Sequence, residues 1–125
     1  MLQRARAAGV EEMVTIGTRL SRAAEQIALA EQLGSVWCTV GTHPHHAAEE
    51  DLPQEQDIVA LAAHPRVIAV GEAGLDYFYD RSPRDLQAEV FRRQIRAARQ
   101  AGVPICIHTR DAEDDTLAIL PFRAG

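Results

Sequence analysis

Two residues with metal-binding side chains follow apolar runs in this sequence. Glu72 comes shortly after Val67–Val70, and His108 comes directly after Ile105–Ile107. Imidazole is the commonest metal ligand, and a carboxylate can bridge two ions because it has two oxygens. In two-metal hydrolysis the ions lie about 3.5–4 Å apart and hold the attacking and leaving oxygens. Alone, a residue such as Glu72 is more often a helix cap or an ion-pair partner, and one such as His108 is more often a core histidine. Together, at matching strand ends, the two residues indicate a metal site.

The segment Gly41–His46 contains three histidines. One interpretation is that His43 or His45 faces the site as a general acid or a phosphate-binding group. The other is a turn with exposed histidines. The density of imidazoles favours the functional interpretation, with His46 as a bystander.

Arg110 comes two residues after His108, where its guanidinium could form a forked hydrogen bond with a phosphate. The sequence almost equally allows an ion pair with Asp111, Glu113 or Asp114. Asp76 could orient an arginine or a metal ligand from behind the site, or it could simply stabilise a turn. Both alternatives stay open at this point.

Short apolar strands alternate with helical segments along the chain. The strands are expected at Met13–Thr18, Val36–Val40, Val67–Val70 and Ile105–Ile107. The helices are expected at Leu2–Ala8, Arg22–Leu33, about Pro53–Ala63, Pro83–Gln100 and about Asp114–Leu120, with Ser21 and Ser82 as caps. The strands are near-continuous apolar runs, typical of parallel strands buried on both faces. The sequence therefore predicts an α/β fold.

The long helix predicted at 83–100 has two distinct faces. Gln87, Phe91 and Gln94 recur at helical spacing, which indicates a packing face with two buried amides. The arginines of this helix are expected to form a solvated face; they are Arg92, Arg93, Arg96 and Arg99.

An α/β chain of this kind forms either a doubly wound sheet or a barrel, and both bind ligands at the carboxyl ends of the strands. The candidate residues fall at those ends: His43 and His45, then Glu72 and Asp76, then His108. Functional residues drawn from several consecutive strand ends are typical of a barrel. Neither common glycine-rich phosphate loop is present, which disfavours a doubly wound nucleotide-binding protein.

Composition limits the classes of function. The chain has 125 residues, 18 acidic against 13 basic residues and a formal charge of -5, and every basic residue is an arginine. This balance excludes a strongly basic surface that coats DNA, but not one small phosphate site. No apolar run approaches the roughly 18–20 residues of a membrane span. Cys38 and Cys106 lie in apolar runs, which predicts buried, reduced thiols and, with no signal peptide, a cytoplasmic protein.

Four segments in order resemble the TatD family of metal-dependent hydrolases. They are Gly41-Thr42-His43-Pro44-His45, Gly71-Glu72-Ala73-Gly74-Leu75-Asp76-Tyr77, Gln87-x-x-x-Phe91-x-x-Gln94 and Pro104-x-x-Ile107-His108-x-Arg110-x-Ala112. The resemblance implies a TIM-type (β/α)8 barrel that binds divalent metal ions, with two ions in the complete site. Zn, Mn, Mg or Fe would suit histidine and carboxylate ligands. It also implies hydrolysis of phosphodiesters, typically as a deoxyribonuclease, so the expected partner is DNA or a small phosphodiester.

The resemblance also implies roles for the candidate residues. Glu72 matches the bridging metal ligand, and His108 matches a second ligand. His43 and His45 match the family's active-site histidine loop, and Arg110 matches an arginine near the substrate.

The match covers only part of the family's pattern. Family members carry a His-x-His pair on the first strand and later His-Cys-Phe and Glu-Thr-Asp segments, which have no counterpart in residues 1–125. A complete barrel of this type has about 250 residues. We therefore expect residues 1–125 to form about four of the eight βα units, without the first strand and the C-terminal strands. Exposed sheet edges would then favour self-association or pairing with another piece.

Three hypotheses follow. The first is a TatD-like hydrolase whose metal site is completed by residues outside residues 1–125. The second is a catalytically incomplete half-barrel that binds metal weakly or serves as an interaction module. The third is a barrel hydrolase acting on C–N bonds, which is disfavoured because the chain has no lysine to form a carbamylated bridge.

Overall fold

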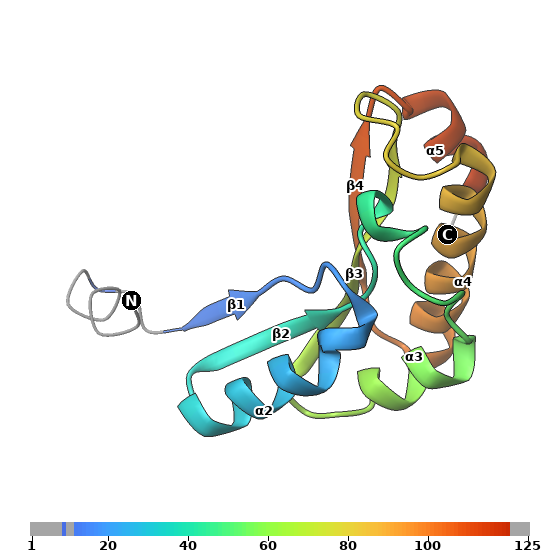
Figure 1. Cartoon of the computed structure of the whole chain (residues 1–125). Helices are drawn as coiled ribbons and strands as arrows, with labels where there is room; N and C mark the ends of the chain where they lie inside the picture. The colour runs from blue at the N-terminus through green and yellow to red at the C-terminus, as the bar shows by residue number, and fades with distance from the viewer. Residues whose placement is uncertain (1–8, 10–11, 121–125) are drawn as a thin grey trace.

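The computed structural model describes residue 9 and residues 12–120. Its centre is one parallel sheet in which each strand pairs with its neighbour in the chain (Figure 1). The strands are β1 (Met13–Thr15), β2 (Val36–Val40), β3 (Val67–Asp76) and β4 (Ile105–Arg110). A doubly wound sheet reverses its strand order, whereas a barrel adds strands in chain order. The observed order is therefore that of four successive units of a barrel.

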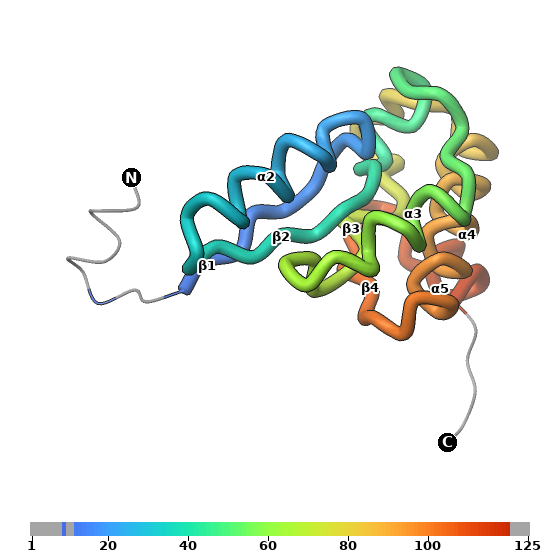
Figure 2. Tube along the Cα trace, turned by 90° about the horizontal axis from the view of Figure 1, so that it is seen from below, coloured from blue at the N-terminus to red at the C-terminus, as the bar shows by residue number. Residues whose placement is uncertain are grey.

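The helices alternate with these strands as predicted. They are η1 (Leu20–Arg22), α2 (Ala23–Leu33), η2 (Pro44–His46), α3 (Glu55–Ala62), α4 (Arg84–Ala101) and α5 (Glu113–Ile119). α2 packs against β2, while α3 and α4 pack against β3 and against each other (Figure 2). The helix predicted at 2–8 lies outside the described residues. Among the described helices, none has the length and apolarity needed to cross a bilayer.

The predicted serine caps are wrong. Neither α2 nor α4 receives a side-chain hydrogen bond at its N-cap. The Ser82 hydroxyl instead accepts the N–H of Ala48 and donates to the carbonyl of His45, so it joins two loops. A tertiary contact has replaced the local cap, because the segment around η2 lies within hydrogen-bonding distance of Ser82, two residues before α4.

The third and fourth strands extend further than their apolar runs. β3 continues through Glu72 to Asp76, and β4 continues to Arg110. Gly74 makes the extension possible: its φ is +145°, and a Cβ there would collide with the carbonyl oxygen of His108. Glu72, Asp76, His108 and Arg110 therefore belong to paired strands, whereas His43 and His45 lie after the end of β2.

The main core lies between the sheet and the helices. It includes Val36, Cys38 and Val40 of β2, which alternate with Trp37 and Thr39 on the opposite face. Cys38 is fully buried, as predicted, whereas Cys106 is only partly buried, because it lies on the strand at the sheet's edge.

The opposite face of the sheet carries exposed apolar side chains. Val14 pairs with Trp37 and therefore shares its face, and Ile68 follows the core residue Val67. Val14 is 46% exposed and Ile68 is 39% exposed. In a closed barrel this face is the packed interior.

The close approach at Gly74 generates a stability prediction. Gly74→Ala should lower the free energy of unfolding by about 3 kcal/mol, because the methyl group must separate β3 from β4 and the backbone is strained. Gly102→Ala is the matched control, since Gly102 also has a positive φ, +71°, but no atom lies within 4 Å of a Cβ there. It should cost about 1 kcal/mol. Urea unfolding measures both, and equal losses would contradict the packing argument.

Candidate functional site

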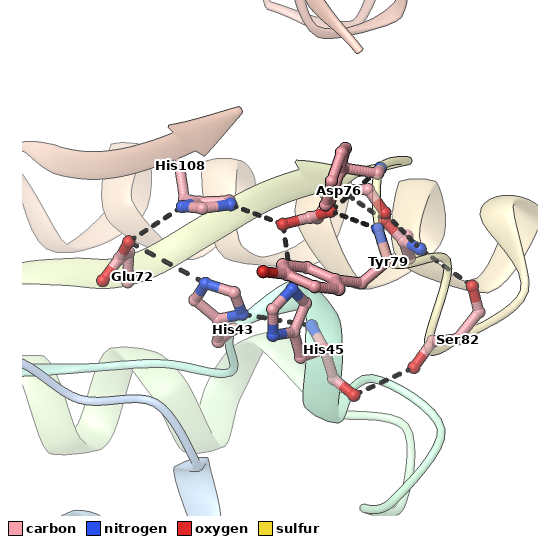
Figure 3. A network of polar contacts seen from close by, with 9 residues as sticks. His43, His45, Glu72, Asp76, Tyr79, Ser82 and His108 are labelled. Carbon is pink, nitrogen blue, oxygen red and sulfur yellow. Dashed lines mark hydrogen bonds and ion pairs between the residues drawn. The ribbon is translucent and has the colours of Figure 1, made fainter. Parts of the chain in front are cut away.

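The carboxyl ends of β2, β3 and β4 bring the predicted site residues together. His43 and His45 come from η2 after β2, Glu72 and Asp76 from β3, and His108 from β4 (Figure 3). Oε1 of Glu72 lies 3.2 Å from Nδ1 of His108 and 3.9 Å from Nε2 of His43. Residues distant in sequence thus form one polar cluster at one end of the sheet.

Asp76 is the buried centre of this cluster, with 1% of its surface exposed. Its Oδ2 lies 2.8 Å from Nε2 of His45 and 2.9 Å from Nε2 of His108. Its Oδ1 accepts the backbone N–H groups of Phe78 and Tyr79, both at 3.1 Å. The sequence left two roles open for Asp76, and its carboxylate performs both. Oδ2 orients the two histidine rings, and Oδ1 stabilises the turn after β3.

These bonds keep Asp76 ionised. Burial alone would raise its pKa, but the hydrogen bonds from His108, Tyr79 and His45 outweigh burial and hold the pKa far below its usual range. An ionised carboxylate only accepts hydrogen bonds. His45 and His108 must therefore each carry a proton on Nε2, which leaves Nδ1 of His108 facing Glu72.

His43 has the opposite orientation. Its Nδ1 accepts the N–H of His45 at 3.1 Å, at the N-cap of η2. Burial, together with the neighbouring rings of His108 and His45, lowers the pKa of His43 to about 4. The ring is therefore neutral at pH 7 and carries its proton on Nε2, which points toward Glu72. His43 thus presents a neutral N–H toward Glu72, although at 3.9 Å the two atoms are too far apart for a hydrogen bond.

The facing pair of Glu72 and His108 fits a metal ion. Ligand atoms of His43, Glu72 and His108 all lie within 4.8 Å of one another. Nδ1 of His108 and Oε1 of Glu72 face each other at 3.2 Å, so a cation beside them could be bound by both atoms. Imidazole and carboxylate are suitable ligands for a divalent metal. Because the Nε2 of His43 carries a proton, Glu72 and His108 are the better ligands of the three.

The backbone around Glu72 is held by a buried hydroxyl. Thr39 donates to the carbonyl of Gly71 at 2.8 Å and accepts the N–H of Gly17 at 2.9 Å. The N–H of Glu72 itself donates to the carbonyl of Gly17 at 2.6 Å. The loop after β1 therefore supports Glu72 even though it contributes no candidate ligand.

Two glutamines of α4 position the segments that carry the site. Gln94 accepts the N–H of Thr42 at 3.0 Å and donates to its carbonyl at 3.0 Å. Gln87 does the same with Asp76, at 2.8 and 3.2 Å. The prediction of two buried amides is confirmed. Their backbone partners, Thr42 and Asp76, were not predicted from the sequence. The signal for such a role was the spacing of the two glutamines, which lie two helical turns apart on the packing face.

Glu50 is a second residue that the sequence analysis missed. Its Oε1 accepts the Thr42 hydroxyl at 2.8 Å and the N–H of Leu20 at 2.9 Å, and its Oε2 accepts the N–H of Ser21 at 2.9 Å. Burial raises its pKa, but these hydrogen bonds outweigh burial and lower it below 4.5. Glu50 thus ties η1 to the segment that precedes His43.

The remaining candidates lie at the margin of the cluster. His46 pairs with Glu49 at 2.6 Å, as expected of a bystander. Arg110 stacks its guanidinium 4.2 Å from the centre of the Phe78 ring and 5.2 Å from that of Tyr79. Within the described part of the chain, none of the ion pairs that the sequence allowed for Arg110 is formed.

Comparison with known proteins identifies the family. The sequence model of the family described as TatD related DNase matches residues 1–123. The chain belongs to the TatD family. The predicted resemblance to this family is thus confirmed.

Curated relatives show how much of the family's length the chain spans. It is 43% identical to an uncharacterized metal-dependent hydrolase, YabD of Bacillus subtilis (strain 168), over 96% of this chain and 47% of the relative. It is 36% identical to the 3'-5' ssDNA/RNA exonuclease TatD of Escherichia coli (strain K12), over 90% of this chain and 44% of the relative. The chain spans about half the length of the curated relatives it matches.

The fold agrees with a solved structure. The TatD homologue YJJV from Escherichia coli K12 superposes with a TM-score of 0.82 and 28% identity, over 94% of this chain and 46% of that one. The four parallel strands are therefore a half-barrel of the TatD type, as predicted from the sequence.

The hydrogen bonds of Glu50 generate a pH-dependent prediction. Glu50→Gln should lower the free energy of unfolding by about 1 kcal/mol at pH 7, since Glu50 is partly exposed. Because folding lowers the pKa of Glu50, this stabilisation is present above pH 4.5 and is lost as the pH falls below it. Thermal unfolding from pH 7 to 3.5 should show the two proteins converging.

Asp51→Asn serves as the control for this comparison, because Asp51 makes no hydrogen bond within the described residues. It should leave the unfolding curve unchanged at pH 7. A difference between Glu50→Gln and the wild-type chain that persists at low pH would contradict the role of the ionised carboxylate.

Proposed function

We propose that this chain forms the half-barrel of a divalent-metal-dependent hydrolase that cleaves phosphodiester bonds in nucleic acid. The observation that carries the proposal is the convergence of Glu72 and His108, whose facing ligand atoms lie 3.2 Å apart at the carboxyl ends of adjacent strands. Membership of the TatD family supports a metal-dependent hydrolase. The nuclease relatives support nucleic acid as the substrate class.

In this proposal Glu72 and His108 would hold divalent metal through their carboxylate and imidazole groups. Bound divalent ions supply Lewis acidity toward a water molecule and a phosphate oxygen. Asp76 holds the ring of His108 so that Nδ1 stays directed at the metal position, which is the usual carboxylate–histidine support of a ligand.

The remaining candidate residues act on the substrate. His43 offers a neutral Nε2–H at the same point and would donate to a phosphate oxygen without adding charge. His45 is held by Asp76 through Nε2, and its ring closes the site beside that of His43, with the ring centres 4.4 Å apart. Arg110 would steady a phosphate at the outer margin.

We further propose that residues 1–125 supply one half of the barrel and that other strands complete the metal site. Such strands would cover the sheet face that exposes Val14 and Ile68 and would pair with the edges of β1 and β4. They could belong to a longer chain or to a second copy. The alternative is a half-barrel that binds metal weakly and does not turn over substrate. The following test distinguishes this alternative from the hydrolase.

Glu72→Gln should abolish metal-dependent cleavage of a single-stranded oligonucleotide and weaken Mn²⁺ binding by at least about tenfold, because the amide removes the ligand charge. Isothermal titration calorimetry measures the binding, and gel analysis of a labelled oligonucleotide measures the cleavage.

The matched control is Glu31→Gln, which disrupts another carboxylate–histidine pair, Glu31 with His64 at 2.9 Å, on the exposed surface. This control should bind metal and cleave like the wild-type chain. Metal binding without cleavage by the wild-type chain would favour the incomplete half-barrel. Equal binding by the two variants would refute the assignment of Glu72.

A further inference from the structure

Two exposed aromatic rings lie two and three residues after Asp76. Phe78 is 55% exposed and Tyr79 is 47% exposed. Their ring centres lie 4.8 Å apart in an edge-to-face arrangement. Neither ring belongs to the core clusters of the described residues, so packing of the fold does not account for them.

Guanidinium groups border both rings. Arg110 lies 4.2 Å from the ring centre of Phe78, and Arg81 lies 5.1 Å from that of Tyr79. Among the described residues, neither arginine forms an ion pair, whereas Arg84 nearby is neutralised by Asp80 at 2.8 Å. The rings are thus flanked by two guanidinium groups that form no ion pair with a carboxylate of the described residues.

This cluster adjoins the candidate site. The ring of Tyr79 meets that of His45 edge-on with the centres 5.3 Å apart, and Figure 3 shows it beside Asp76. Arg110 lies two residues after His108 on β4. The backbone N–H groups of Phe78 and Tyr79 are both bonded to Asp76, so one carboxylate fixes the turn that bears the rings and the histidines of the site.

We propose that Phe78, Tyr79 and Arg110 form a stacking platform for a nucleobase of a single-stranded substrate, placed next to the phosphate that the site would cleave. The proposal rests on the proposed function, which it deepens. Aromatic faces and guanidinium planes bind unpaired bases of any sequence. In a duplex the faces of the bases are occupied by their neighbours, so the platform selects unpaired ends.

The charge of the chain supports stacking as the source of affinity. With a formal charge of -5 and no lysine, the chain lacks the broad basic surface that holds a nucleic acid by its phosphates alone. The two unpaired arginines provide local phosphate contacts, and the rings provide contact area.

The test measures binding without turnover. Fluorescence anisotropy in EDTA, which removes metal, compares a labelled oligothymidylate with the same strand carrying abasic sites at its end. Phe78→Ala should weaken binding of the intact strand about tenfold, and Phe78→Trp should restore it. The matched control is Leu29→Ala, which removes a 46% exposed apolar side chain from α2 rather than from the turn after β3. It should bind like the wild-type chain.

The abasic strand provides the decisive comparison. The wild-type chain should bind it about tenfold more weakly than the intact strand, and Phe78→Ala should bind both strands alike. Arg110→Lys, which keeps the charge but loses the planar group, should also reduce the preference for the intact strand.

The proposal is overturned if Phe78→Ala weakens both strands equally, or if the wild-type chain does not distinguish them. Cleavage assays with Mn²⁺ separate it from the proposed function. Turnover without any base preference would leave the hydrolase intact and refute the platform. Base-dependent binding by a chain that shows no turnover would support the platform and favour the incomplete half-barrel over the hydrolase.

Discussion

The carboxylate of Asp76 is the interaction on which the site depends. It accepts four N–H groups, from two histidine rings and two backbone amides, and it does so while almost fully buried. Burying a charge is costly unless it is saturated with donors. These donors come from η2, β4 and the turn after β3, so satisfying one charge fixes three segments relative to one another.

Helix α4 connects this cluster to the core. Gln87 and Gln94 are seven residues apart, about 10 Å along the helix axis, and each pairs with both backbone groups of one residue, Asp76 or Thr42. Phe91 lies between them in the core, fully buried. A shift of the helix would therefore break buried amide bonds as well as apolar packing, and both strand ends would move. The geometry of the site is thus a consequence of how α4 packs.

The sequence predicted the elements well because their signals are local. Apolar runs marked the strands, and the residues that follow them, Glu72 and His108, were correctly expected at one end of a parallel sheet. The extension of β3 to Asp76 was not predicted, because Gly74 and polar residues normally end a strand. Only the close passage of β4 explains why a glycine stands there. The side-chain hydrogen bonds of Ser82 and Glu50 were missed for a similar reason, since all of their partners except Thr42 lie 29 or more residues away.

The three histidines of the cluster show why residue type alone does not assign a role. His45 and His108 donate through Nε2 to an ionised carboxylate, which leaves Nδ1 of His108 facing Glu72. His43 accepts a backbone N–H at Nδ1, which leaves a proton on Nε2. The same side chain therefore turns Nδ1 toward Glu72 in one position and a neutral Nε2–H toward it in another. Burial reinforces the difference, because it lowers the pKa of His43 to about 4 and so keeps a second positive charge away from the proposed metal position. The partner of each ring, and not the number of histidines, determines the chemistry that this end of the sheet can support.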